Sequence, residues 1–221
     1  MRVLLFGATG SAGGSVLKVC LAAPAVEEVR AIVRRPLAAA HAKLRSIPHA
    51  DFADYSAVAD AFDDVDACLY CLGTSATQVP EEAAYRRITQ TFAVAAAAMM
   101  KERTALAAFH FVSGSGAGLD SRFMWAKVKA ETERDLIASV GAVCWRPGFI
   151  DGERSTSGPR LYQWLRPVGR LLIPFQSLYV SGAEIGRAML QATTEGTRSR
   201  IIENSELRAI ARRAGPMITG S

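Results

Sequence analysis

Residues 3–16 read Val-Leu-Leu-Phe-Gly-Ala-Thr-Gly-Ser-Ala-Gly-Gly-Ser-Val and decide the fold of this chain. The first four residues of this stretch are apolar, as expected of a parallel strand buried on both faces. A helical pattern of apolar residues starts at Val16. Between strand and helix lie three regularly spaced glycines: Gly7, Gly10 and Gly13. Strand, glycine turn and helix in this order predict the first unit of a doubly wound parallel α/β sheet, the Rossmann fold.

Each glycine of this turn has a physical task. The first turns the chain tightly out of the strand, the second lets the backbone approach a pyrophosphate, and the third lets helix and strand pack closely. The helix N-terminus adds free N–H groups and the positive end of the helix dipole, which attract phosphate. The sequence therefore predicts dinucleotide binding by this turn and the start of the helix: Gly7, Thr9, Gly10, Ser11, Ala12 and Gly13.

Length and composition indicate one globular domain. The chain has 221 residues, of which 50% are hydrophobic and 21% are charged. These values suit an α/β protein with a sizeable core and argue against disorder. We expect one dinucleotide-binding domain over residues 1–221, with a small C-terminal substrate-side lobe formed by segments at about 147–180 and 193–221.

Charge and hydropathy limit the partners and the location. The net charge of +5 comes from Lys and Arg residues that are scattered rather than gathered in a run. This distribution argues against a nucleic-acid partner and fits an anionic cofactor. The N-terminal apolar run is too short for a secretory signal, and the longest apolar stretch, residues 92–100, is too short to span a bilayer. We therefore expect a cytoplasmic protein without a membrane partner.

Cys68 and Cys71 have the spacing of a redox or zinc-binding pair. They belong to an apolar strand, in which residues three apart point to opposite faces. The chain has four cysteines in total and no second pair of this kind to complete a zinc site. We expect reduced cysteines and no metal site.

The second predicted strand, residues 29–33, ends in Arg34, Arg35 and Pro36. An acidic residue at this position binds the ribose 2′-hydroxyl of NAD, whereas a nearby arginine accommodates the 2′-phosphate of NADP. This strand end has two arginines and no acid, and arginine binds phosphate in a bidentate manner. The sequence favours NADP(H) over NAD(H); the alternative is a pair of solvated arginines before a proline turn.

Further apolar runs alternate with helical patterns and complete the sheet. We expect a short helix or loop at 37–47, a long helix at 81–101 and a fifth strand at 107–112. The fourth strand ends at Gly73 and Thr74. Ligands of such sheets bind at the carboxyl ends of the strands, which places these two residues near the middle of the dinucleotide.

A later helical stretch carries one stripe of residues at steps of three and four: Trp125, Lys129, Thr132, Leu136 and Val140. The apolar members mark this stripe as sheet-facing, so Lys129 lies on the buried side, whereas Lys127 points to solvent. Because burying a lone ammonium group is costly, Lys129 needs a partner, and ribose hydroxyls of the cofactor would serve. A lysine that snorkels at the sheet edge is the alternative.

Seven motifs cover nearly the whole chain: Gly-Ala-Thr-Gly (7–10), Arg-Arg (34–35), Cys-Leu-Gly-Thr (71–74), Ser-Gly-Ser (113–115), Lys-Ala-Glu-x-Glu (129–133), Trp-Arg-Pro-Gly (145–148) and Ile-Glu-Asn (202–204). Together they resemble an atypical short-chain dehydrogenase/reductase near the NmrA-like group. The resemblance extends to the Tat-interacting protein type of NADPH-binding proteins. The first motif is specific to the fold and cofactor, and the later ones are individually weak.

This resemblance implies roles for several residues. Asp51, together with Phe52, follows the third strand and would reach the adenine. A serine at the end of the fifth strand would donate a hydrogen bond to the substrate carbonyl; Ser113 and Ser115 are both candidates, and we favour Ser115. Lys129 would hold the nicotinamide ribose and take part in catalysis.

The chain departs from the family at the catalytic tyrosine. The usual pair is Tyr-x-x-x-Lys, and with Lys129 as the lysine the tyrosine position holds Trp125. An indole N–H does not titrate usefully, so the proton comes from Lys129, from another tyrosine such as Tyr162, or from water if the acceptor is a quinone. We expect an NADPH-dependent oxidoreductase acting on a small carbonyl or quinone. The alternative is a non-catalytic NADP(H)-binding sensor or scaffold.

The C-terminal part lies on the substrate side. Residues 151–158 predict a polar loop, and residues 161–172 form an apolar, aromatic stretch. This stretch would wall a pocket for an apolar or aromatic small molecule, or form a core helix or a contact in a homodimer; we expect a monomer or a homodimer. A final helix carries three arginines on a face that we expect to be solvated: Arg208, Arg212 and Arg213.

Overall fold

The computed structural model describes residues 1–104, 106–151 and 179–215. Its main element is a sheet of seven parallel strands in the order β3-β2-β1-β4-β5-β6-β9. These strands are β1 (Arg2–Phe6), β2 (Glu28–Val33), β3 (Leu44–Pro48), β4 (Ala67–Tyr70), β5 (Ala108–Val112), β6 (Val143–Arg146) and β9 (Arg200–Glu203). The predicted doubly wound parallel α/β fold is confirmed.

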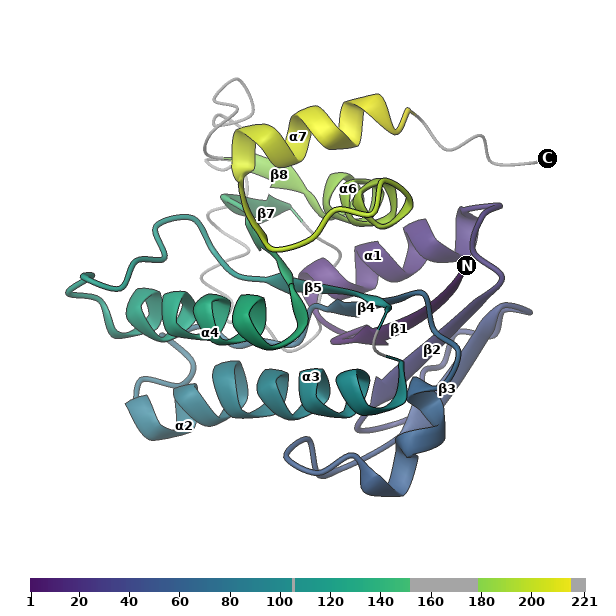
Figure 1. Ribbon diagram of the computed structural model, residues 1–221, viewed down its shortest axis with the longest axis horizontal. Coiled ribbons are helices and arrows are strands. Elements are labelled where there is room, and N and C mark those ends of the chain that lie inside the picture. Colours follow the sequence, from purple (N-terminus) through teal and green to yellow (C-terminus); the bar gives the residue numbers. More distant parts are fainter. Residues whose placement is uncertain (105, 152–178, 216–221) are drawn as a thin grey trace.

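Helices cover both faces of this sheet (Figure 1). One face carries α1 (Ser11–Ala22), α6 (Gly182–Thr194) and α7 (Asn204–Arg213). The other carries the 3₁₀ helix η1 (Ser56–Phe62), α2 (Glu82–Arg86), the π-helical turn η2 (Arg87–Thr91), α3 (Phe92–Arg103) and α4 (Met124–Val140). Two short strands, β7 (Phe149–Asp151) and β8 (Tyr179–Ser181), form a separate parallel pair.

Strand β1 lies at the centre of the sheet and has no exposed apolar side chain. Val3 and Leu5 point to the face with α1, and Leu4 and Phe6 point to the face with α3. The ring of Phe6 lies 5.0–6.4 Å, between centroids, from the rings of Phe52, Tyr55, Phe62 and Tyr70. The continuous apolar run of β1 therefore reflects burial on both sides.

One expectation about the other elements needs correction, and a second, the helix at 81–101, is confirmed with a π-helical turn inside it. Residues 44–47 lie in the edge strand β3, where we expected a helix or loop. Pairing with β2, for example of Ile47 with Ile32, stabilises the extended conformation of these residues, which the short local sequence pattern does not predict. The long helix expected at 81–101 is a run of α2, η2 and α3, interrupted by the π-helical turn. It starts after Glu81, whose carboxylate accepts hydrogen bonds from the N–H groups of the first turn.

Helix α6 approaches α1 closely because two glycines face it. A Cβ atom on Gly182 would lie 2.5 Å from Cβ of Ser15, and one on Gly186 would lie 2.9 Å from Cβ of Val19. The four-residue spacing on both helices places these contacts one turn apart. The C-terminal part of the chain is thereby packed directly onto the helix that follows the glycine turn.

A fully buried histidine links three elements on this face of the sheet. The indole N–H of Trp145 in β6 donates to Nδ1 of His110 in β5, at 3.1 Å. The other ring nitrogen of His110 lies 2.9 Å from the hydroxyl of Thr193 in α6. Because Nδ1 accepts a hydrogen bond, Nε2 of the neutral ring carries the hydrogen and donates it to the hydroxyl oxygen of Thr193. Burial lowers the pKa of His110 to about 3, so its ring is neutral.

Part of the predicted substrate side lies outside the described residues. This part includes Tyr162, most of the polar loop predicted at 151–158 and the apolar stretch predicted at 161–172. No helix within the described ranges combines the length and the apolar character needed to cross a membrane.

Candidate nucleotide-binding and active site

The glycine turn after β1 has the close packing that its spacing predicts. Gly7 has φ +76°, and a Cβ atom there would lie 2.6 Å from the carbonyl carbon of Cys71 after β4. A Cβ atom on Gly13 would lie 2.1 Å from the carbonyl oxygen of Gly7. That oxygen accepts a hydrogen bond of 2.8 Å from the N–H of Gly10. Only glycine fits at positions 7 and 13 without moving the turn or the helix.

The N-terminus of α1 is open to an anion. Gly10 is its N-cap, no side chain caps it, and its first turn contains no acidic residue. Thr9 and Ser11 are exposed, and Ala12 is partly exposed. Free N–H groups at the positive end of a helix dipole are a phosphate-binding arrangement. The residues present therefore fit the pyrophosphate of a dinucleotide.

The glycine turn lies at the point where the strand order of the sheet reverses. Strand β1 pairs with β2 on one side and β4 on the other, so the ends of all three strands meet at one edge. Gly73 and Thr74 follow β4 at this edge; Gly73 is exposed, and a Cβ atom there would meet no other atom within 4 Å. Such a reversal point is where doubly wound sheets bind their ligands.

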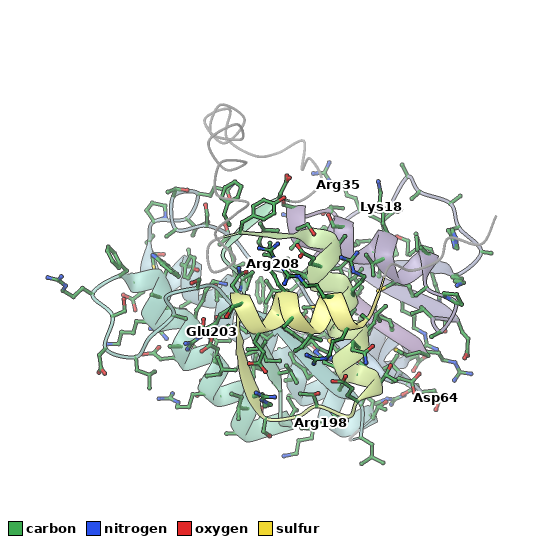
Figure 2. The ribbon with its side chains drawn as sticks, turned by 90° about the horizontal axis from the view of Figure 1, so that it is seen from above. Lys18, Arg35, Asp64, Arg198, Glu203 and Arg208 are labelled. Atoms are coloured by element: carbon green, nitrogen blue, oxygen red, sulfur yellow. The ribbon has the colours of Figure 1, made fainter. Side chains whose placement is uncertain are left out.

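Arg34 and Arg35 directly follow β2 at the same edge. Both side chains are exposed, and neither forms a hydrogen bond or ion pair with another described residue. Figure 2 shows the Arg35 side chain pointing outward from the edge of the ribbon. The two guanidinium groups are therefore free to bind a phosphate, although their assignment to the 2′-phosphate stays a prediction.

Asp51 and Phe52 follow β3 but have different surroundings. Asp51 is exposed, and its carboxylate accepts a hydrogen bond of 3.0 Å from the N–H of Ala53. Phe52 is only 6% exposed, and its ring packs against Phe6 and Phe92 in the core. The side chain of Phe52 thus belongs to the core. The contact of this pair with adenine stays a prediction.

Lys129 lies on the sheet-facing side of α4, as its position in the helical stripe predicts. Its Nζ donates to the carbonyl oxygens of Ser113 at 2.8 Å and Val112 at 3.3 Å, at the end of β5. It also lies 5.6 Å from the ring centroid of Phe111. Burial of the ammonium group lowers the pKa of Lys129 to about 8, and the nearby carboxylate of Glu133 opposes this shift. Lys127 is exposed, as expected.

The loop after β5 brings Trp125 and the two candidate serines close to Lys129. A Cβ atom on Gly114 would lie 3.7 Å from both the Trp125 ring and Cδ of Lys129. Ser113 is 5% exposed, and its hydroxyl oxygen is buried without a hydrogen-bond partner among the described residues. Ser115 is exposed, and its N–H donates to the carbonyl of Pro147. The catalytic roles of Ser115 and Lys129 stay predictions.

A buried ion-pair network near Lys129 is the feature that sequence reasoning missed. Glu133, one turn after Lys129, is 1% exposed and binds the guanidinium group of Arg146 at the end of β6. Arg146 also contacts Glu203 at 3.0 Å. Glu133 and Arg146 both belong to motifs that the sequence shows, at 129–133 and 145–148. No local sequence pattern, however, indicates that these two motifs meet in the fold.

Arg208 differs from the expectation of a solvated face. Its side chain is 11% exposed, and its Nε lies 3.2 Å from a carboxylate oxygen of Glu184 in α6. The reason is that α7 packs on α6, where Glu184 also completes a capping box with Ser181. Arg212 and Arg213 are exposed, as predicted.

The cysteines behave as core residues. Cys68 lies in the core on the α3 face, and Cys71 packs against the core on the α1 face, as the three-residue spacing predicts. All four cysteines are free. Among the described residues, no group of histidine, cysteine or acidic side chains is arranged to hold a metal ion.

Comparison with known proteins agrees with this geometry. Residues 7–142 match a family described as NAD(P)H-binding. The mitochondrial protein FMP52 of Eremothecium gossypii is 28% identical over 225 residues, which cover 96% of this chain and 98% of that relative. The mitochondrial protein FMP52 of Saccharomyces cerevisiae is 32% identical over 160 residues, which cover 71% of this chain and 69% of that relative.

Solved structures with the same fold include an oxidoreductase and a dehydratase. An oxidoreductase of the short-chain dehydrogenase/reductase family from Burkholderia thailandensis has a TM-score of 0.72 at 17% identity, covering 94% of this chain and 92% of that chain. The dTDP-glucose 4,6-dehydratase DesIV from Streptomyces venezuelae, solved with NAD bound, has a TM-score of 0.68 at 16% identity, covering 96% of this chain and 80% of that chain.

The names of the relatives correct one prediction. The FMP52 proteins of Eremothecium gossypii, Candida albicans and Saccharomyces cerevisiae are all called mitochondrial, which contradicts the cytoplasmic location predicted from the sequence. That prediction relied on the lack of an apolar secretory signal. Mitochondrial targeting segments are amphipathic and rich in arginine, so the test for an apolar run does not detect them.

Proposed function

The chain belongs to the NAD(P)H-binding family, and we propose that it is an NADP(H)-dependent oxidoreductase that transfers hydride to a small carbonyl or quinone acceptor. The resemblance to short-chain dehydrogenases/reductases is confirmed by the family match and the fold. A nicotinamide cofactor supplies the hydride chemistry when it is bound, and the protein orients it and controls protons.

The observation that carries the proposal is the position of Lys129. Its ammonium group is held on the carbonyl groups at the end of β5, on the same sheet whose reversal point carries the glycine turn. With its pKa lowered to about 8 by burial, Lys129 is mostly protonated at pH 7 and can release its proton more easily than an ordinary lysine. A group with this pKa is suited to donate a proton at neutral pH.

In this proposal Lys129 does the work of the missing tyrosine. It would donate its proton to the oxygen of the acceptor as that oxygen gains negative charge, and water would restore the proton afterwards. Ser115, which is exposed on the same loop, would donate a hydrogen bond to that oxygen. Trp125 beside Lys129 offers an aromatic surface, which favours an apolar or aromatic small molecule as the acceptor.

The preference for NADP(H) has separate support. Arg34 and Arg35 are exposed after β2 without partners among the described residues, and no acidic residue occupies this strand end. Two free guanidinium groups would bind a 2′-phosphate and would leave a ribose 2′-hydroxyl without its usual carboxylate partner. We therefore propose that the protein selects the phosphorylated cofactor.

One observation favours a second candidate function. Trp125 packs on the loop after β5 at the position where the related enzymes carry their catalytic tyrosine, and it lacks a titratable proton. A protein with the cofactor site intact and the proton donor lost would report NADP(H) to a partner without turnover. Binding alone does not separate the two functions, but oxidation of the cofactor does.

The test is calorimetric binding of NADPH and NADH to one preparation, followed by NADPH oxidation against a panel of small quinones and aldehydes. We expect NADPH to bind at least about tenfold more tightly than NADH, a difference of about 1.4 kcal/mol. Oxidation that is lost in Lys129→Ala but kept in Lys127→Ala would support the oxidoreductase. Binding without oxidation would support the sensor, and binding of neither nucleotide would refute both.

A further inference from the structure

Two residues that the proposed function leaves unused, Glu133 and Arg146, come from different sequence motifs and meet in one ion pair. Glu133 ends the motif at 129–133 and lies 1% exposed on α4. Arg146 belongs to the motif at 145–148 and ends β6. Nε and one terminal nitrogen of Arg146 donate to the two carboxylate oxygens of Glu133, at 2.9 and 2.6 Å. This bidentate geometry is the strong, directional form of the interaction.

The pair lies between the two parts of the candidate active site. Glu133 is one helical turn after Lys129, whose Nζ is held by the carbonyls at the end of β5. On the other side, Arg146 lies between Trp145 and Pro147. The carbonyl groups of these two residues accept hydrogen bonds from the N–H groups of the serine loop: Ser113 at 2.7 Å and Ser115 at 2.9 Å. Fixing Arg146 to Glu133 therefore fixes the serine loop relative to α4.

We propose that the Glu133–Arg146 ion pair is a positioning unit for Lys129, which locks α4 to the end of β6 and keeps the ammonium group charged and seated at the end of β5. The proposal deepens the function proposed above, because it concerns the same lysine. Glu133 and Arg146 are positioning residues, because they would act on the reaction through Lys129 and the serine loop.

The charges around Lys129 support this role. Burial lowers the pKa of Lys129 and the Glu133 carboxylate opposes this shift, while β5 contributes carbonyl groups and the ring of Phe111. Arg146 is balanced by two carboxylates, Glu133 and Glu203, and its pKa is raised by both. The cluster is thus neutral only when Lys129 is protonated, which favours the charged lysine.

Stability alone is a poor reason for such a pair. Desolvation of two charges offsets much of their attraction, and well-packed apolar residues of the same size often replace a buried pair without loss of stability. This property provides a test. The double variant Glu133→Leu with Arg146→Met should fold, because it leaves no unpaired buried charge, but it removes the carboxylate that acts on Lys129.

The experiment measures the pH dependence of chemical labelling of the Lys129 amino group by mass spectrometry, without cofactor. Lys127, exposed two residues away, is the internal reference in every sample. Glu133→Gln keeps the size of the side chain and an acceptor for Arg146 but removes the charge. Glu131→Gln is the matched control, because Glu131 lies on the same helix and pairs instead with Arg86.

In the wild type, the labelling midpoint of Lys129 should lie near the pKa of about 8. We expect Glu133→Gln and the double variant to lower this midpoint by about one pH unit, and Glu131→Gln to leave it unchanged. A wild-type midpoint in both Glu133 variants would overturn the proposal. An equal shift in Glu131→Gln would also overturn it, because the effect would then not be specific to the pair.

The readout separates this inference from the proposed function. If the wild type binds neither nucleotide, the proposed function fails, yet the labelling profile of the cofactor-free protein still decides whether Glu133 acts on Lys129. If the wild type binds NADPH, both Glu133 variants should bind it about tenfold more weakly while Glu131→Gln binds as the wild type does. Unchanged affinity together with an unchanged midpoint would leave the pair a purely structural contact and would refute the inference.

Discussion

Replacing Gly13 by alanine tests the geometry of the glycine turn. The new Cβ atom would lie 2.1 Å from the carbonyl oxygen of Gly7 and 2.6 Å from its carbonyl carbon. Ordinary contacts begin near 3.4 Å, so α1 must move away from the turn by about 1.3 Å. Overpacking of this kind costs about 1–3 kcal/mol, and the movement also displaces the N–H groups that would bind the pyrophosphate.

Gly14→Ala is the matched control on the next residue of the same helix. Its Cβ atom would lie 3.4 Å from the carbonyl oxygen of Ala8, an ordinary contact, and alanine favours the helix over glycine by about 0.5–1 kcal/mol. In denaturant unfolding, we expect Gly13→Ala to lose about 1–3 kcal/mol and Gly14→Ala to lose nothing. In calorimetry, Gly13→Ala should bind NADPH at least about tenfold more weakly. The reasoning is refuted if the two variants behave alike in both assays.

Three further predictions concern other parts of the structure. The double variant Arg34→Ala with Arg35→Ala should weaken NADPH binding at least about tenfold and leave NADH binding nearly unchanged in calorimetry; equal losses would show that these arginines do not contact the 2′-phosphate. Because His110 is buried and neutral, with its pKa lowered from 6.5 to about 3, folding stability should be fully present above pH 6.5 and fall as the pH drops towards 3, by about 2 kcal/mol at pH 5. In urea unfolding, His110→Gln should reduce the loss of unfolding free energy between pH 7 and pH 5. An unchanged loss would contradict the conclusion that buried, neutral His110 causes the pH dependence. Gly186→Ala should destabilise the fold by about 1–3 kcal/mol, since its Cβ atom would lie 2.9 Å from Cβ of Val19. The combination with Val19→Ala should cost less than the sum of the two single changes, and strict additivity would show that the helices do not meet there.

Much of the nucleotide-binding half could be predicted because its signals are local. The strand, the glycine turn and the helix of residues 3–22 follow one another directly, so spacing alone shows that they form one unit. The position of Lys129 on the sheet-facing side of α4 follows from helical periodicity in the same way. A third strand before Asp51 was expected from the resemblance, but its residues were assigned to a helix or loop, because an isolated five-residue segment has little pattern of its own and is stabilised by pairing with β2.

The candidate active site was harder to predict because its contacts cross the sequence. The sequence left two candidate serines, and the structure shows that Ser113 is buried and Ser115 exposed. The sequence did not identify a partner for Lys129 within the protein. In the structure, the partners of its ammonium group are two carbonyl groups at the end of β5. These contacts depend on where α4 packs on the sheet. Neither the sequence of α4 nor that of β5 determines this position alone.

By itself, the sequence determined the doubly wound fold, the glycine turn for a dinucleotide and the replacement of the usual tyrosine by Trp125. Each of these features depends on a few consecutive residues or on one helical period. Only the tertiary structure decided that Glu133, Arg146 and Glu203 form one network, and that this network lies beside Lys129. Its members belong to α4, β6 and β9 and become neighbours when parallel strands bring their carboxyl ends to one edge of the sheet.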